Sequence, residues 1–433
     1  MINLGRKVLL FLAVTAVAGA VNVFEGEATG TEKVAGEVTV MFWNLENFFD
    51  FVDGGAGESD TEFSATGPRR WSKKRFYRKC QTVAKTILWA GSGREGAGLP
   101  DIVGMAEVEN RFVLNQLVTK TALRKLDYET VHFDSPDPRG IDCALLYRAS
   151  RLTLVSARPC RVSAPDLQTR DILLAQFLTP SGDSLAVLVN HHPSKYGGGE
   201  TDWRREVAVA RLRALGDSLA AAGWTRAVAV GDFNDTPDNP LFRTLEPAFS
   251  FCRYTGGRGS IRFNGEWQLI DLCFVSPALA GEASFSVQEP PFLTERDAAH
   301  SGDRPLRTYS GPRYLGGVSD HRPILVRLKL NQAGRYSSRS LPSPIRIAVP
   351  SFSSRPFPFP SSEPFPSTDE PASQSTSSPI LNTPAQAVAF VPQGVLPNYM
   401  YRQIAPNTFF LYKYPEKGPN TANSKTNCTG NTK

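Results

Sequence analysis

Histidine and cysteine are scarce in this sequence of 433 residues, which contains 5 histidines and 6 cysteines. No two cysteines have the spacing of a C-x-x-C pair, and there is no H-E-x-x-H motif. Because zinc sites are typically built from Cys and His at such short spacings, nothing here indicates a zinc protein. Cys143 and Cys273 lie within apolar runs, which predicts that they are core residues.

Apolar runs long enough to cross a membrane are also lacking. The first 20 residues have a basic start at Arg6 and Lys7, an apolar run from Val8 to about Val17, and small residues in A-x-A spacing up to Ala20. The run is shorter than the roughly 20 residues of a membrane span, and the pattern is typical of a secretory signal peptide. We expect cleavage near Ala20 and export to the periplasm or beyond the cell, with no stable span afterwards; a buried core helix is the alternative.

Apolar periodicity disappears from about Asn331 onward, where the chain becomes rich in Pro and Ser. Such a segment buries too little surface to offset the entropy of ordering it, so residues 331–433 are predicted to be a low-complexity, disordered tail. The stretch "TFFLYKYPEKG" near its end is a candidate for a small strand-like element.

An excess of charge of one sign is missing from residues 37–330, which contain 36 basic and 35 acidic side chains. A near-neutral domain weakens the case for electrostatic binding of long nucleic acids. One cluster, "RRWSKKRFYRKC", is basic; it leads into a helical pattern ending near Trp89, and we interpret it as the solvated face of an amphipathic helix.

What the sequence does contain, between residues 37 and 330, is a series of short apolar runs separated by a few helical patterns. No interior linker and no internal repeat interrupts the series. These features predict a single α/β domain built mainly on strands.

Polar side chains stand at the ends of nearly all these runs. They are Asn44 and Glu46; Glu107 and Glu109; Asn190, His191 and His192; Asp232, Asn234 and Asp235; Asp271; and Asp320 with His321. Strand ends are rigid positions beside loops that leave room for a ligand, so this placement predicts a functional site.

Carboxylate and amide oxygens suit Mg²⁺ or Mn²⁺, with Ca²⁺ a further option. Mg²⁺ usually takes one or two protein carboxylates, and Glu107 fits this role with help from one or two of Asn44, Glu46 and Asp320.

The remaining polar groups suit the hydrolysis of a phosphoester. Asp232 is the candidate base for an attacking water, and Asn234 the candidate donor to a phosphoryl oxygen. A protonated His191 or His321 would supply positive charge, and Asp271 is the candidate partner that keeps His321 protonated.

Six motifs in order, "FWNLENF", "AEVEN", "VNHHPSKYGG", "VGDFND", "LIDLCFVS" and "SDHRPI", resemble those of the endonuclease/exonuclease/phosphatase superfamily of DNase I-like metal-dependent phosphoesterases. The resemblance covers nearly all of residues 37–330 and implies a four-layer α/β sandwich, with two mostly antiparallel sheets face to face and helices outside. It also implies roles for matching residues: Asn44 orders the site, Glu107 binds metal, His191 contacts phosphate, Asp232 and Asn234 belong to G-D-x-N, Asp271 pairs with the last histidine, and Asp320 and His321 close the site.

The sequence departs from the family pattern at two positions. Ala106 stands where many members have Gln, and Glu46 where some have Asp, which leaves open whether Glu46 and Glu109 reach the ion. Arg139 lies where members often place a phosphate-contacting side chain, with a structural arginine as the alternative. We expect His132, His192 and His300 in loops or on the surface.

Three functions are compatible with these observations. The first is an exported metal-dependent phosphodiesterase acting on DNA or RNA, with water activated by Asp232. The second is the same chemistry on a small or lipid-borne phosphoester, and the third is a surface binding protein that keeps the fold without turnover. A monomer is assumed throughout. Loops set specificity in such folds, and their composition does not separate the three functions.

Overall fold

The computed structural model describes residues 36–55, 58–92, 98–195, 198–330, 399–405 and 408–413. The predicted signal peptide, residues 1–20, lies outside the described residues, as does most of the predicted tail. The chain divides into two compact units, Met1–Pro344 and Ile345–Lys433, which are described separately.

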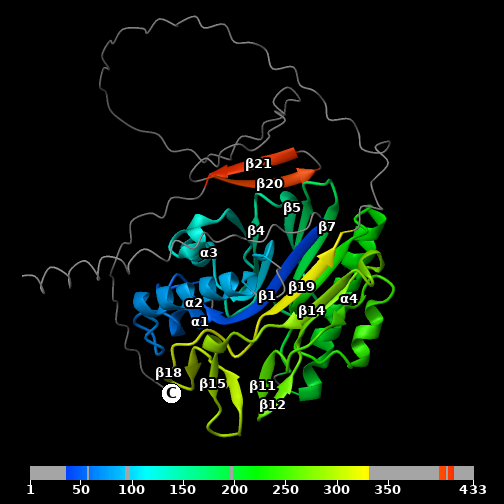
Figure 1. The fold of residues 1–433 in the computed structure, drawn as a ribbon. Coiled ribbons are helices and arrows are strands. Elements are labelled where there is room, and N and C mark those ends of the chain that lie inside the picture. Colours follow the sequence, from blue (N-terminus) through cyan, green and yellow to red (C-terminus); the bar gives the residue numbers. More distant parts are fainter. Residues whose placement is uncertain are drawn as a thin grey trace, which may run out of the picture. The chain divides into compact units, whose positions relative to one another are not determined.

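The first sheet of the larger unit has seven strands, with β1 and β2 near its centre. Their order is β10 (Arg253–Tyr254), β14 (Ala283–Val287), β19 (Ile324–Lys329), β1 (Glu37–Phe48), β2 (Ile102–Val108), β4 (Asp142–Arg148) and β3 (Tyr128–His132). Within this order only β10 with β14 and β1 with β2 pair in parallel. In Figure 1, β1 runs beside β19.

The second sheet has six strands and is also mostly antiparallel. Their order is β5 (Thr153–Cys160), β6 (Ile172–Leu178), β7 (Ser184–His191), β8 (Ala227–Asp232), β13 (Asp271–Val275) and β9 (Ser250–Phe251). The β7 and β8 strands are its parallel pair.

Apolar side chains from both sheets form the core between them. Val40 and Phe42 of the first sheet and Val187, Val189 and Val230 of the second belong to this cluster, and all are buried. Because these central strands are covered on both faces, their sequences are nearly continuous apolar runs instead of alternating ones. Cys143 and Cys273 belong to the same cluster, which confirms that they are core residues.

Helices cover the outer face of each sheet. The outer face of the first sheet packs against α2 (Lys73–Gly91) and α3 (Arg111–Thr119), and that of the second against α4 (Asp202–Ala221). The α2 and α4 helices lie on opposite sides of the domain (Figure 1). The layers are therefore helix, sheet, sheet and helix, which confirms the predicted four-layer sandwich.

Short elements complete this unit. Three hairpins are formed by β11 (Ile261–Phe263) with β12 (Glu266–Gln268), β15 (Thr294–Arg296) with β16 (Asp303–Pro305), and β17 (Tyr309–Ser310) with β18 (Arg313–Tyr314). The remaining helical turns are α1 (Glu58–Glu62), η1 (Ala122–Lys125), η2 (Gly198–Thr201), η3 (Pro240–Leu245), η4 (Pro277–Leu279) and η5 (Pro291–Leu293).

In the smaller unit, β20 (Tyr399–Ala405) and β21 (Thr408–Lys413) pair as an antiparallel hairpin. The second strand begins at the "TFFLYK" stretch that the sequence marked as strand-like. Among the described residues of the whole chain, no helix is both long and apolar enough to cross a membrane. The five cysteines in the described part are buried and free.

Candidate active site

Three neighbouring strands of the second sheet each contribute one polar residue to the same edge. His191 ends β7, Asp232 ends β8 and Asp271 begins β13. In the strand register His191 lies opposite Asp232, and Asp271 lies opposite Asp232 on the other side. Regular pairing therefore places Asp232 between the other two.

The first sheet contributes residues where its strands become irregular. The register of β1 with β2 shifts between Asn44 and Phe48, and left-handed backbone occurs at Glu46, Asn47 and Glu107, with φ of 46°, 55° and 62°. Left-handed conformations are uncommon for residues other than glycine and concentrate at functional sites. Bulged strands re-aim side chains, and here they turn Glu107 toward the neighbouring strand.

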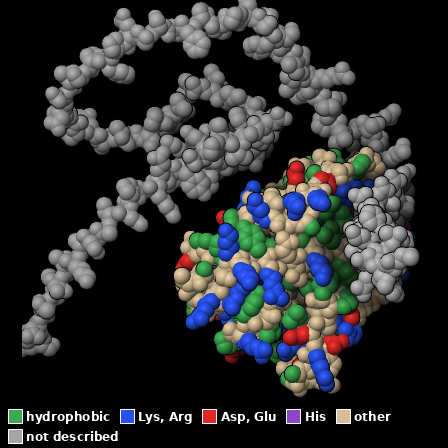
Figure 2. Space-filling model, turned by 60° about the vertical axis from the view of Figure 1, so that its left-hand side comes forward, with side chains coloured by type: hydrophobic (Ala, Val, Ile, Leu, Met, Phe, Trp, Pro, Cys, Tyr) green, Lys and Arg blue, Asp and Glu red, His purple; other side chains and the backbone are tan. Residues whose placement is uncertain are grey.

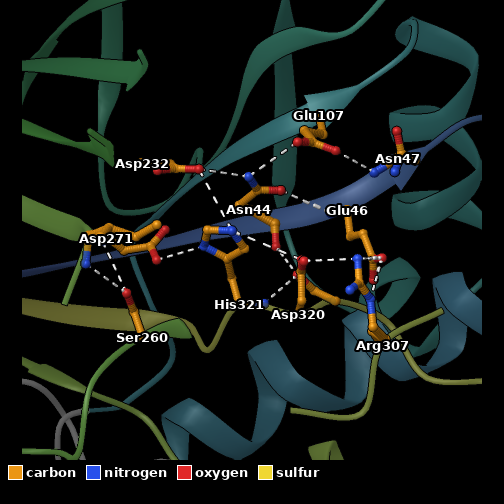
Figure 3. Close-up of polar contacts among 12 residues, drawn as sticks. Asn44, Glu46, Asn47, Glu107, Asp232, Ser260, Asp271, Arg307, Asp320 and His321 are labelled. Atoms are coloured by element: carbon orange, nitrogen blue, oxygen red, sulfur yellow. Dashed lines mark hydrogen bonds and ion pairs between the residues drawn. The ribbon is translucent and has the colours of Figure 1, made fainter. Parts of the chain in front are cut away.

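Asp232 is the centre of the site, and its carboxylate is 2% exposed. Its Oδ2 accepts a hydrogen bond from Nδ2 of Asn44 at 3.0 Å and lies 3.7 Å from Nε2 of His321 (Figure 3). It also lies 3.7 Å from Nε2 of His191. Its Oδ1 accepts the backbone N–H of Asn234 at 2.9 Å. Burial raises the pKa of Asp232 to about 7, against the lowering effect of the nearby His321.

His321 is paired with a fully buried acid. Its Nδ1 lies 2.8 Å from Oδ2 of Asp271, whose backbone N–H donates to the hydroxyl of Ser260 (Figure 3). Burial alone would lower the pKa of His321, but the carboxylates of Asp271 and Asp232 outweigh it and raise that pKa well above its ordinary value. The geometry therefore favours a protonated His321 with Nε2 directed toward Asp232.

His191 has the opposite electrostatic environment. Burial lowers its pKa well below the ordinary value, and the positive charges of Arg170 and Arg139 lower it further. Its Nε2 lies 3.9 Å from Oε1 of Glu107, so a neutral His191 faces both Glu107 and Asp232. Of the two histidines proposed as sources of positive charge, the electrostatics favour His321.

Asn44 bridges the two halves of the site. Its Nδ2 contacts Asp232 at 3.0 Å and Oε1 of Glu107 at 3.4 Å, while its Oδ1 accepts the backbone N–H of Glu46 (Figure 3). Oε2 of Glu107 accepts the backbone N–H of Asn47 at 2.7 Å. Asn44 is thus placed to orient two carboxylates at once.

The three residues predicted to bind metal are not gathered in one group. Glu46 turns to Arg307, which donates to Oε1 of Glu46 at 2.7 Å and lies 3.0 Å from Oδ2 of Asp320 (Figure 3). The other Glu46 oxygen accepts the N–H of Thr308. Among the described residues, some groups of acids and histidines have their ligand atoms within 4.8 Å of one another. None of these groups contains Glu46, Glu107 and Asp320 together. Arg307 instead joins Glu46 to Asp320.

A buried lysine also contacts Glu46 and Thr308. Lys79 is 2% exposed, and its Nζ donates to the backbone oxygen of Glu46 at 2.7 Å and to Oγ1 of Thr308 at 3.0 Å. Burial lowers the pKa of Lys79 to about 8, and burial with the nearby Asp320 raises that of Glu46 to about 7. The expectation that the basic cluster is entirely a solvated face is therefore wrong for Lys79.

Other predicted residues lie at the edge of the site or away from it. The Nδ2 of Asn234 donates to the backbone oxygen of His192 at 2.9 Å, and Arg139 lines a cavity beside Pro193 and Ser194. Glu109 points elsewhere: it accepts the N–H of Asp50, and burial raises its pKa to about 8.

Of the histidines expected in loops or on the surface, His192 lies in the loop directly after β7, as expected, but it is buried. It is 1% exposed, with its ring 4.6 Å from that of Phe233. His132 is also buried; it ends β3 and lies 3.1 Å from Oδ2 of Asp142. His300 is exposed, as expected.

Sequence reasoning missed Arg307, Lys79 and Asn47. The backbone N–H of Asn47 and the charge of Arg307 act on carboxylates that are distant along the chain, and no local pattern marks either. Lys79 had one signal, because it lies at helical spacing with the apolar residues Phe76, Cys80 and Val83, which are all buried.

Comparison with known proteins decides the family. The model of the Endonuclease/Exonuclease/phosphatase family matches residues 39–330. The chain belongs to this family. The protein is therefore a member of a phosphoesterase family, whose members are hydrolases of phosphoester bonds, and a phosphoester substrate fits this family. No curated protein sequence matches the chain.

Solved structures of similar fold include three with low identity. A family member from Bacteroides thetaiotaomicron is 17% identical with a TM-score of 0.45, covering 68% of this chain and 98% of its own. A mannosyl-6-phosphatase from the same organism is 16% identical with a TM-score of 0.44, covering 67% and 98%. The human Nocturnin catalytic domain with bound sulfate is 16% identical with a TM-score of 0.44, covering 69% and 96%. Likenesses this weak carry no argument about substrate.

Family members generally use divalent metal ions, and the donor set here fits one. The side chain of Glu107 is 12% exposed, and that of Asp320 is 28% exposed. Mg²⁺ needs one or two protein carboxylates and leaves its other positions to water and substrate oxygens. The carboxylate of Glu107 meets this need, because it accepts hydrogen bonds from two neutral amide groups, those of Asn44 and Asn47. The carboxylate of Glu46 is instead paired with the positive charge of Arg307.

Proposed function

We propose that the protein is an exported, divalent-metal-dependent phosphoesterase that hydrolyses a phosphodiester in the manner of a nuclease. The observation that carries this proposal is the position of Asp232. One buried carboxylate oxygen lies within 3.7 Å of His191 and His321 and 3.0 Å from Asn44, at the shared edge of two sheets. This geometry supports a base that works between a cation and a phosphate.

Asp232 acts as the base that orients and deprotonates the attacking water. A pKa of about 7 is close to the value at which a base is both ionised and able to accept a proton. The Asn44 amide and the Asn234 backbone N–H hold the carboxylate in one orientation. The attacking oxygen then approaches in line with the leaving group.

His321 stabilises the negative charge that develops on the phosphoryl oxygens. The Asp271 carboxylate keeps the imidazole protonated and fixes the ring through Nδ1, so that Nε2 is left to donate. A positive donor that is already oriented needs no rearrangement as the charge develops. Asn234 adds a neutral donor, and neutral His191 contacts the phosphate from the other side.

Glu107 would hold the divalent ion, Mg²⁺ or Mn²⁺, with Asn44 fixing its carboxylate. When bound, such an ion neutralises phosphate charge and polarises the scissile bond. Asp320 is the candidate second ligand, because its side chain is 28% exposed beside His321.

The distribution of charge favours a polyanionic substrate such as DNA or RNA. The domain is near neutral overall, yet α2 contains no acid, and Lys73, Lys74, Arg78 and Lys85 on it are exposed. On the face turned forward in Figure 2, Lys and Arg side chains outnumber Asp and Glu. Basic surface attracts a phosphate backbone without sequence preference. The proposal of export rests on the pattern of residues 1–20.

The test is a substrate panel with Mg²⁺, Mn²⁺, Ca²⁺ or EDTA: plasmid DNA, RNA, bis-p-nitrophenyl phosphate, p-nitrophenyl phosphate and sphingomyelin. We expect cleavage of nucleic acid and of the diester that vanishes in EDTA and returns with Mg²⁺ or Mn²⁺. Asp232→Asn should remove it, and Asp238→Asn, which changes an exposed acid on the same loop, should keep it.

Three other outcomes contradict the proposal. Hydrolysis of only the monoester or of sphingomyelin would assign the same chemistry to a small or lipid-borne substrate. No turnover of any substrate would favour a binding protein, and full activity in EDTA would refute metal dependence.

A further inference from the structure

A cavity of about 470 Å³ opens beside the proposed active site. Its walls come from the loop between β3 and β4, the segment before β6, the residues that follow β7, and the first turn of α4. The residues that matter here are Asp137, Arg139, Thr169, Arg170, Ser194 and Arg204.

The cavity carries an excess of positive charge. Its lining includes three arginines and one acid. Asp137 lies 2.9 Å from Nη1 of Arg170 and 3.5 Å from Nε of Arg139, so one acid is shared between two cations. Arg204 is exposed and has no acidic group within 4.0 Å among the described side chains. An anion that enters meets at least one guanidinium with free donors.

The cavity and the catalytic centre share a wall. The backbone oxygen of His192 accepts hydrogen bonds from Nη2 of Arg170 at 2.6 Å and from Nδ2 of Asn234 at 2.9 Å. Pro193 lines the cavity and lies two residues after His191, a span of about 7 Å in an extended chain. A substrate therefore needs only a short connection to occupy both places.

Two buried polar groups at the cavity have unused hydrogen-bonding capacity. The hydroxyl of Thr169 and the Nε of Arg170 lack a partner among the described residues, although these residues are 2% and 6% exposed. Buried polar groups are nearly always satisfied, because leaving them unpaired costs free energy. Because both atoms are themselves shielded from solvent, they make the surroundings of the cavity polar and are not contacts to a ligand inside it.

We propose that this cavity is an anion subsite that receives a second phosphate group of the substrate, one unit along the chain from the phosphate that is cleaved. The inference rests on the proposed function and deepens it by naming the substrate class. Guanidinium groups bind phosphate through paired donors, and the excess of positive charge in the lining suits an anionic phosphate group. A separate, smaller cavity next to Glu46 is lined by Arg69 and Arg307, which adds further positive charge near the site.

The kinetic test compares thymidine 5′-(p-nitrophenyl phosphate) with the same compound carrying a 3′-phosphate. The 3′-phosphate should raise kcat/KM about tenfold, the scale of one charge-assisted hydrogen bond. Arg204→Gln should bring this ratio close to one. Arg253→Gln should preserve the ratio, because Arg253 lines a different cavity. That cavity also includes Glu37 and Lys329, which lie at the ends of β1 and β19 remote from the site.

A binding measurement separates this inference from the proposed function. Calorimetry in EDTA should show that thymidine 3′,5′-bisphosphate binds the full chain about tenfold more tightly than thymidine 5′-monophosphate, and that Arg204→Gln removes the difference. Arg139→Gln should reduce the difference as well, which keeps the test open if Arg204→Gln does not fold.

Equal binding of the two nucleotides, or an unchanged preference in both variants, would refute the subsite whatever the protein hydrolyses. An arginine-dependent preference in a protein that cleaves no member of the substrate panel would support the subsite and contradict the proposed function.

Discussion

The two sheets of the sandwich place their site residues by different means. In the second sheet, His191, Asp232 and Asp271 are consecutive members of one register across three regular strands. In the first sheet, Glu46 and Glu107 stand on left-handed backbone where the pairing of β1 with β2 is broken. One half of the site follows from regular pairing, and the other half depends on local distortion.

This difference corresponds to a division of chemistry. The regular half holds Asp232, the proposed base, and Asp271, the acid that keeps His321 protonated. Both act over short distances, so their action depends on well-defined distances and angles. The distorted half holds the candidate ion ligand and is supported by two cations, Lys79 and Arg307, which contact Glu46. Rigid geometry serves proton transfer and charge stabilisation, and the irregular backbone brings a carboxylate to a position that a regular strand would not reach.

A large effect is expected from removing His321, which contacts Asp271 and Asp232 of the regular half. His321→Ala should lower kcat by about 10²–10³-fold, because a donor to developing charge is lost. Asp271→Asn should lower it less, since the ring remains. The double variant should be little worse than His321→Ala, because Asp271 acts through His321. Steady-state rates on the diester of the panel measure all three.

The pH profile gives a second readout of the same pair. The cationic form of His321 exists below its raised pKa, so activity should fall as the pH rises through that pKa. Asp271→Asn removes the main raising cause and should move the alkaline limit to lower pH, whereas Asp238→Asn should not. If the losses of kcat in His321→Ala and Asp271→Asn were fully additive in the double variant, the pairing of these residues would be contradicted. Asp271 would then have a structural role.

The regular half was largely predictable from the sequence. Apolar runs ending in His191 and Asp232, and one beginning at Asp271, marked positions that regular pairing brings to one edge. The four-layer fold was predictable for a similar reason, because doubly covered strands give continuous apolar runs. His192 lies in a loop as expected, but its burial was not predictable, because it depends on packing against Phe233, which is distant along the chain.

The distorted half was less accessible to sequence reasoning. Glu46, Glu107 and Asp320 were grouped as ligands because all three are acids at strand ends. Glu46 instead pairs with Arg307, which lies in a loop 261 residues away along the chain, and no local pattern predicts that contact. Left-handed backbone at Glu46 and Glu107 has no local signature either, since neither residue is Gly or Asn.

The comparison becomes sharper if the two glutamates of the first sheet are changed in parallel. Glu107→Gln should raise the Mg²⁺ concentration for half-maximal activity by about 10–100-fold, because an ion ligand is lost. Glu46→Gln should change it little and instead lower the free energy of unfolding by about 1–3 kcal/mol, because charged hydrogen bonds to Arg307 and Thr308 are weakened.

Calorimetric titration with Mn²⁺ checks the first effect without turnover, and urea unfolding in EDTA checks the second. If Glu46→Gln weakens Mn²⁺ binding as strongly as Glu107→Gln, then Arg307 gives way to the ion and Glu46 is a ligand after all.

The smallest expected effect concerns the regular half in the absence of any ligand, through His192. Burial, with Arg170 and Arg205 nearby, lowers its pKa to about 3 from an ordinary value of 6.5. Below about pH 6.5, His192 therefore binds a proton in the unfolded chain but not in the folded chain. The stability of the fold consequently falls as the pH falls from about 6.5 toward about 3. At pH 5.5 the loss from this one group is on the order of 1 kcal/mol.

His192→Phe, which keeps a ring against Phe233, should lose less stability between pH 7 and 5.5 in urea unfolding. His300→Gln, at an exposed site, should match the unaltered protein. An equal pH slope in all three proteins would show that His192 accepts a proton without cost, and that the second sheet is less rigid at this edge than its register implies.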